Sequence, residues 1–150
     1  MKKIFVALSL AVLCTCVLVL AEDRSNQSAD LTEIVPVNLI DLAQQNSMGT
    51  KDGLNITQVA SEKNASVNLV MGPVGSILKM HYHQYSDEIT YCIKGQAVMN
   101  VSGKELVMKA GDLMYIPALT LHGSEVTGNE TLQLISIFTP PFDGKDRIYV

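Results

Sequence analysis

Short runs of β-branched, aromatic and long aliphatic residues alternate with turn-forming residues through most of the chain. From Leu54 onward these runs recur at roughly ten-residue spacing, with Gly, Asn and Asp between them. No helical stretch of useful length interrupts the pattern. Many short, evenly spaced strands predict an all-β sandwich or closed barrel. The expected strands are residues 54–60, 66–72, 76–83, 88–94, 96–102, 104–109, 112–116, 121–126 and 131–138.

The first 21 residues differ from the rest of the chain. Two lysines precede an apolar run, and Ala21 stands directly before the charged residues Glu22 and Asp23. This layout is typical of a secretory signal and predicts export to the periplasm or the outside of the cell. An uncleaved membrane anchor stays an alternative, because Ile4 to Ala21 is 18 residues long, at the lower limit for crossing a bilayer.

Two short stretches separate this segment from the strands. Residues 22–33 are polar and charged with no hydrophobic period, which indicates a flexible tether. Residues 35–46 predict an edge strand followed by one or two helical turns. The expected organisation is therefore a signal peptide or anchor at 1–21, the tether at 22–33 and one domain at 34–150, a length that suits a single core.

The charge balance excludes some classes of partner. The 150 residues include 11 basic and 15 acidic side chains, for a formal net charge of −4. Loss of residues 1–21 would remove Lys2 and Lys3 and leave 9 basic residues against 15 acidic ones, a charge of −6. No block of Lys or Arg would remain, so we expect no nucleic-acid partner, and membrane contact only through the N-terminal segment. Cys92 would then be the one remaining cysteine, which excludes an intramolecular disulfide.

The chain has three histidines, and their spacing is informative. His81 and His83 are two residues apart in a strand-like run, so both imidazoles project to one face. Glu88 opens the next predicted strand after a short turn. His122 lies on its own strand, and we expect it to complete the group from the other side of a barrel. A lone histidine would favour a packing role, but all three together with a glutamate predict one metal site.

The chemistry of these four side chains narrows the metal. Three imidazoles and one carboxylate suit a divalent Mn, Fe, Ni, Cu, Zn or Co ion better than Ca²⁺ or Mg²⁺. One carboxylate against a dication leaves a net charge of about +1, which favours an anionic, chelating or enolate-like small molecule as ligand.

These residues resemble the two signature motifs of the cupin superfamily. The first motif, G-x5-H-x-H-x4-E-x6-G, is complete in Gly75, His81, His83, Glu88 and Gly95. The second, G-x5-P-x-G-x2-H-x3-N, is matched at Gly111, Pro117 and His122. Leu119 stands where glycine is usual, and Val126 stands where asparagine is usual. Leu119 would therefore need a turn without positive φ, or would be strained.

The resemblance implies a double-stranded β-helix, or jelly-roll, barrel with the metal inside near one mouth. It also implies a homodimer as the expected assembly. The metal ligands would be His81, His83, Glu88 and His122, a set similar to that of germin-like and quercetinase-like members. The family includes dioxygenases, isomerases, lyases and proteins that bind without catalysis, and the fold does not select among them.

Our leading hypothesis is a metal-dependent oxidoreductase of the dioxygenase type that acts on a small organic molecule. Glu88 would be both a ligand and the catalytic proton acceptor. Two alternatives stay open: an exported module that binds a metal or small ligand without catalysis, and an isomerase or lyase that needs no oxygen.

Other side chains near the motifs have less specific interpretations. Cys92 shares a face with Glu88 and is expected to be a buried hydrophobe. Lys79 alternates with the histidines, and a rim position is favoured over the pocket. Phe142 is expected to plug the barrel end. Arg147 can reach a ligand in principle, but a solvated tail residue is the favoured interpretation.

Overall fold

The computed structural model describes residues 36–50 and 53–150. The signal or anchor at 1–21 and the tether at 22–33 lie outside the described residues. No described helix is both long and apolar enough to cross a membrane. The elements in chain order are α1 (Leu39–Gln45), β1 (Asn55–Ser61), β2 (Ser66–Gly72), β3 (Ile77–His83), β4 (Asp87–Lys94), β5 (Gln96–Val101), β6 (Lys104–Lys109), β7 (Leu113–Ile116), β8 (His122–Thr127), β9 (Leu132–Thr139) and β10 (Arg147–Tyr149).

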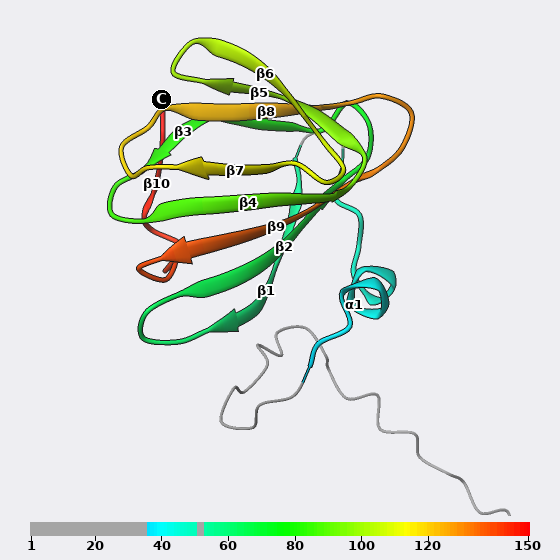
Figure 1. The fold of residues 1–150 in the computed structure, drawn as a ribbon, viewed down its shortest axis with the longest axis horizontal. Helices are drawn as coiled ribbons and strands as arrows, with labels where there is room; N and C mark the ends of the chain where they lie inside the picture. The colour runs from blue at the N-terminus through cyan, green and yellow to red at the C-terminus, as the bar shows by residue number, and fades with distance from the viewer. Residues whose placement is uncertain (1–35, 51–52) are drawn as a thin grey trace, which may run out of the picture.

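The strands form two five-stranded antiparallel sheets, which confirms the all-β, jelly-roll prediction (Figure 1). One sheet has the order β1-β2-β9-β4-β7, and the other has the order β10-β3-β8-β5-β6. The hairpins β1-β2 and β5-β6 stay within one sheet, whereas the other consecutive strands lie in different sheets, so that strands distant in the chain become neighbours. For example, β2 and β4 both pair with β9.

The core lies between the two sheets because strand alternation turns one face of each inward. In β9, Leu132, Leu134, Ser136 and Phe138 are buried while the intervening residues are more exposed. The buried core between the sheets comprises Val70, Cys92, Ala97, Met99, Met108, Ile116, Val126, Leu132 and Leu134. Burial of this apolar surface is the main term that holds the sheets together.

The helix α1 covers part of an outer sheet face. Ala43 of α1 packs in a second cluster with Val59, Leu69 and Met71, whereas Val70 belongs to the core between the sheets. The expected edge strand before this helix is wrong for the described residues 36–38, which form no strand. Asn38 is instead the N-cap, and its Oδ1 accepts hydrogen bonds from the amides of Ile40 (2.9 Å) and Asp41 (3.2 Å).

The sequence pattern does not predict β10. This strand has only three residues and pairs antiparallel with β3, in the register Arg147↔His83, Ile148↔Tyr82 and Tyr149↔His81. Three residues are too few to show a period-2 pattern, so only the tertiary pairing reveals the strand. The C-terminal segment is thereby placed beside the two histidines of β3 (Figure 1).

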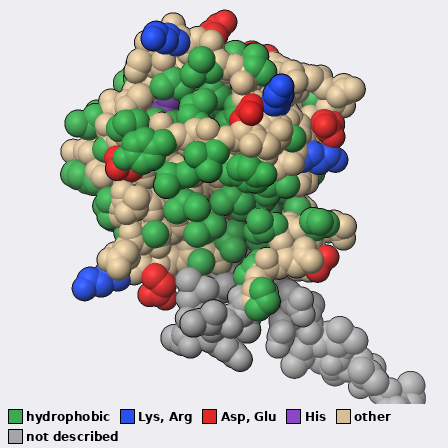
Figure 2. Space-filling model, in the orientation of Figure 1, with side chains coloured by type: hydrophobic (Ala, Val, Ile, Leu, Met, Phe, Trp, Pro, Cys, Tyr) green, Lys and Arg blue, Asp and Glu red, His purple; other side chains and the backbone are tan. Residues whose placement is uncertain are grey.

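Exposed apolar residues gather on the outer face of β4 and β7. Tyr91 and Leu113 are cross-strand partners, and Tyr115 lies two residues further along β7; all three are exposed. Figure 2 shows apolar side chains across the middle of the face viewed, with charged side chains mostly towards its edge. The homodimer stays a prediction, and this exposed apolar face is the candidate for its interface.

The turn before His122 has the strain that the sequence suggested. Pro117 and Thr120 close a four-residue turn, with the Thr120 amide donating to the Pro117 carbonyl at 3.2 Å. Leu119, the third residue of that turn, has φ +65°. A turn of this kind favours glycine at its third position, because a Cβ at positive φ is crowded. Leu119 is thus a strained residue whose side chain is 67% exposed.

Replacing Leu119 with glycine should therefore stabilise the fold. Relief of the left-handed backbone strain outweighs the extra flexibility that glycine gives the unfolded chain, for a net gain of about 0.5–1 kcal/mol in the free energy of unfolding. Urea denaturation measures this directly. The matched variant Ala118→Gly, at the neighbouring turn position, should lose stability, and equal effects of both variants would contradict the assignment of strain to Leu119.

Candidate metal centre

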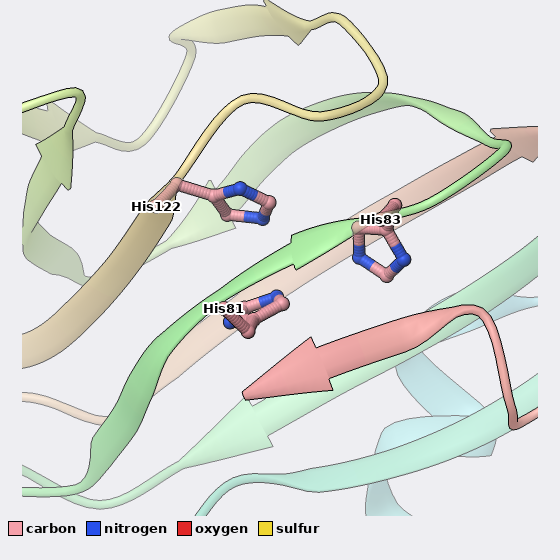
Figure 3. Close-up of side chains that lie close together, drawn as sticks. All are labelled: His81, His83 and His122. Carbon is pink, nitrogen blue, oxygen red and sulfur yellow. The ribbon is translucent and has the colours of Figure 1, made fainter. Parts of the chain in front are cut away.

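The three histidines converge inside the barrel. His81 and His83 come from β3, and His122 begins β8, the neighbouring strand in the same sheet. His81 and His122 are direct cross-strand partners, so their side chains project to the same face. One ring nitrogen of each histidine lies within 4.8 Å of the others (Figure 3).

Glu88 approaches this group from the opposite sheet. Its Oε2 lies 3.3 Å from Nε2 of His122 and 3.7 Å from Nε2 of His83. Glu88 belongs to β4, which pairs with β7 and β9 and not with β3. The expected arrangement is thus reversed: His122 is on the adjacent strand, and Glu88 is the residue that reaches across the barrel.

Each imidazole is anchored through Nδ1. The Nδ1 of His81 lies 2.8 Å from the Lys79 carbonyl oxygen, and the Nδ1 of His122 lies 2.8 Å from the Thr120 carbonyl oxygen. A carbonyl oxygen only accepts, so these Nδ1 atoms carry the proton and donate. The neutral ring then presents a lone pair at Nε2, which is the form that binds metals.

The Nε2 atoms themselves have no hydrogen-bond partner among the residues that the structure describes. All three Nε2 atoms are buried, and each histidine is at most 2% exposed. A buried polar atom without a partner is costly, and three of them at one point are unusual in a packed core. A metal ion coordinated by these lone pairs would remove the cost. The three buried histidines therefore can hold a metal, and nitrogen with carboxylate oxygen fits a borderline transition metal.

The protonation states suit this role. Burial lowers the pKa of His81 to about 4, outweighing the hydrogen bond with the Lys79 carbonyl. Burial likewise lowers the pKa of His83, against the attraction of Glu88. Burial raises the pKa of the Glu88 carboxyl, but the neighbouring His122 and Ser136 side chains, which favour its ionised form, outweigh burial, so the net shift is downward. At neutral pH, His81 and His83 are thus uncharged and Glu88 is ionised, as metal binding requires.

Comparison with known proteins agrees with this geometry. The cupin domain family matches residues 68–138, a stretch that includes all four side chains. The fold is also that of an RmlC-like cupin from Shewanella frigidimarina, with a TM-score of 0.57 and 22% identity over 65% of this chain and 84% of that one. The chain belongs to the cupin superfamily.

Two curated relatives of this cupin have different activities in their names. Quercetin 2,3-dioxygenase of Bacillus subtilis is 30% identical over 124 residues, which are 77% of this chain and 36% of the relative. An oxalate-binding protein of Thermotoga maritima is 34% identical over 65 residues, 43% of this chain and 54% of the relative. The chain therefore spans less than two thirds of the length of either relative.

Asp146 is a residue of the cupin site that sequence reasoning missed. Its Oδ2 lies 3.2 Å from Nδ1 of His83, and its oxygens accept hydrogen bonds from the amides of Tyr85 (2.7 Å) and Ser86 (3.3 Å). Asp146 is 4% exposed. Asp146 therefore orients the ring of His83 through its Nδ1, as backbone carbonyls orient the rings of His81 and His122. No local motif surrounds it, since its partners lie some 60 residues earlier in the chain.

Asp87, next to Glu88, fixes the turn that leads to His122. Its Oδ1 accepts from the Ala118 amide at 2.9 Å, and its Oδ2 accepts from the Tyr115 hydroxyl. The Tyr115 hydrogen bond holds the pKa of the Asp87 carboxyl below its usual range. The Leu119 amide also donates to the His83 carbonyl at 2.7 Å. The turn is thus tied to β3 and β4, which explains how it keeps its shape without the usual glycine.

The remaining predicted side chains divide between core, surface and site. Cys92 is fully buried in the core, and burial raises the pKa of its thiol, in line with a packing role. Lys79 is exposed, because a bulge between Leu78 and His81 breaks the alternation that would have turned it inward. Phe142 packs edge-to-face against His83, with ring centroids 5.5 Å apart.

The favoured interpretation of Arg147 as a solvated tail residue is wrong. Arg147 lines the pocket that also contains Glu88 and His122, and its Nε is buried. Its guanidinium carbon lies 5.0 Å from the centroid of the Phe142 ring. The cause is β10, which turns Arg147 to the face of its register partner His83.

Loss of the Asp146 carboxylate should destabilise the protein. Asp146→Ala leaves His83 Nδ1 and two backbone amides without their acceptor, and we expect a loss of about 2–4 kcal/mol in the free energy of unfolding. Asp146→Asn keeps one acceptor oxygen and should lose clearly less. Chemical denaturation of both variants, with Glu105→Gln as an exposed control, measures the difference. A loss below about 0.5 kcal/mol in Asp146→Ala would contradict the role assigned to it.

Proposed function

We propose that this chain is a metal-dependent cupin of the dioxygenase type, which oxidises a small organic molecule with molecular oxygen. In this proposal His81, His83, Glu88 and His122 hold a divalent transition metal. The observation that carries it is the convergence of three buried, partnerless Nε2 atoms beside an ionised glutamate. The similarity to a quercetin dioxygenase supports an oxygen-using reaction over the other chemistries of the superfamily.

The residues around the site are suited to a small chelating substrate. A bound transition metal would supply Lewis acidity and, if redox-active, electron transfer with dioxygen. Glu88 stands at the border between the histidines and the pocket, where its carboxylate can accept a proton from an enol or phenol. Apolar side chains such as Leu78, Leu134 and Phe138 line the rest of the pocket and exclude water.

A second candidate function is binding without catalysis. One relative is named an oxalate-binding protein. Among the described residues that line the pocket, Glu88 is the one carboxylate, so no second carboxylate is present there to act as a separate acid or base. An isomerase or lyase that needs no oxygen is the third candidate, because the same ligand set serves several reactions on this fold. Export and dimer formation stay predictions alongside all three.

Removing a histidine should remove the metal. We expect His81→Ala and His122→Ala each to retain less metal than the wild type after dialysis against a chelator, because each variant loses one of the four ligands and leaves a gap in the coordination geometry. Elemental analysis of the folded variants tests this, with circular dichroism to confirm the fold. Lys79→Ala, on the same strand but exposed, should retain the wild-type metal content. Full metal content in either histidine variant would refute the proposed site.

Oxygen uptake tests the reaction. Protein loaded separately with Mn, Fe, Co, Ni or Cu should consume dioxygen with at least one member of a panel of phenols, flavonols and dicarboxylates. Glu88→Gln should lower that rate at least about a hundredfold, since it removes both the charge and the proton acceptor. The control Glu125→Gln alters an exposed carboxylate on β8 and should have no effect.

The other outcomes of this experiment separate the alternatives. Absence of oxygen uptake with every metal would refute the dioxygenase proposal. Tight retention of a compound without its conversion, seen by mass spectrometry, would instead support the binding module. Conversion under anaerobic conditions would support an isomerase or lyase.

A further inference from the structure

The last strand adds a cation to the histidine face. Arg147 is the register partner of His83, and Tyr149 is the register partner of His81. Cross-strand partners project to the same side of a sheet, so β10 extends the face that carries the metal ligands. The Tyr149 ring accordingly lies 5.7 Å from the ring of His81. Arg147 lines one pocket together with Glu88 and His122.

This arginine has no anionic partner among the described residues. No described carboxylate lies within 4.0 Å of its guanidinium, and its buried Nε has no hydrogen-bond partner. The adjacent Asp146 does not neutralise it, since the Asp146 oxygens face His83 and the amides of Tyr85 and Ser86. An arginine stays charged at all working pH values, so the pocket contains a positive charge that has no direct ion-pair partner among the described residues.

The surroundings of Arg147 orient this charge. The guanidinium carbon lies 5.0 Å from the centroid of the Phe142 ring, a cation–π contact that stabilises the guanidinium at this position without using its N–H donors. Phe142 in turn packs against Phe138, with ring centroids 5.2 Å apart. The buried residues Thr90, Ser124 and Ser136 also line this pocket, and the Thr90 Oγ1 has no hydrogen-bond partner among the described residues.

We propose that Arg147 binds the carboxylate of a small organic acid and holds that acid against the metal centre. A planar guanidinium offers two parallel N–H donors that match the two oxygens of a carboxylate. The carboxylates of Asp146 and Glu88 balance the charge of a bound dication, so the charge of Arg147 leaves the site net positive, which also favours an anionic ligand. The substrate class is thereby narrowed from any chelating molecule to a carboxylic acid. This inference rests on the proposed metal site.

Titration with oxalate tests the proposal. Zinc-loaded protein is titrated with oxalate by calorimetry, and the metal content of each sample is measured alongside. We expect Arg147→Gln to weaken oxalate binding about tenfold to a hundredfold with unchanged metal content. Arg147→Lys keeps the charge without the planar donor pair, so its oxalate affinity should lie between those of Arg147→Gln and the wild type. Lys145→Gln, an exposed cation two residues away, should bind as the wild type does.

The outcomes separate this proposal from the metal site itself. Wild-type oxalate affinity in Arg147→Gln at full metal content would overturn the role of Arg147 and leave the metal site intact. Absence of oxalate binding by the zinc-loaded wild type would overturn it as well. If the wild-type protein does not bind zinc, the proposed function is refuted. If that metal-free protein still binds oxalate and the binding depends on Arg147, the result supports the anion site alone. If Arg147→Gln does not fold, the Arg147→Lys affinity decides.

Discussion

The structure depends on one constraint: three imidazole nitrogens lie buried together with no hydrogen-bond partner in the described part of the chain. Their Nδ1 atoms are held by the Lys79 and Thr120 carbonyls and by Asp146, so each ring has a fixed orientation and a lone pair at Nε2. A core of apolar side chains would be easier to pack, because no polar atom would need satisfaction. The arrangement is physically reasonable as the site of an ion that the lone pairs coordinate.

This constraint couples the site to the whole barrel. The histidines belong to one sheet and Glu88 to the other, so the four side chains meet only when both sheets have packed. The register between β3 and β8 is equally specific. A Cβ on Gly123 would lie 2.8 Å from the Met80 sulfur and 2.9 Å from the Leu78 carbonyl oxygen, so the residue after His122 must be small for the strands to approach beside the bulge.

The sequence predicted the strands and the convergence of the four side chains, because both depend on local patterns. Alternation of buried and more exposed residues is clear in β5 and β9, and the motif spacing placed Glu88 and His122 near the β3 pair. The favoured rim position of Lys79 agrees with its exposure, and the cause is a bulge that turns the side chain outward. The same reasoning failed where tertiary pairing decides. Asp146 and Arg147 have no pattern around them, since their roles arise from the pairing of β10 with β3.

The distribution of charge then distinguishes this barrel from the fold in general. A jelly roll with three histidines and a glutamate is compatible with several reactions, so the ligands alone do not choose a substrate. The substrate must therefore be selected by side chains of the pocket that are not metal ligands. Here Asp146 is occupied by His83 and two amides, while its neighbour Arg147 lies unpaired against Phe142. Two adjacent residues of opposite charge thus serve different purposes: the anion orients a ligand of the metal, and the cation stays available for a substrate. A pocket built in this way discriminates by charge before it discriminates by shape.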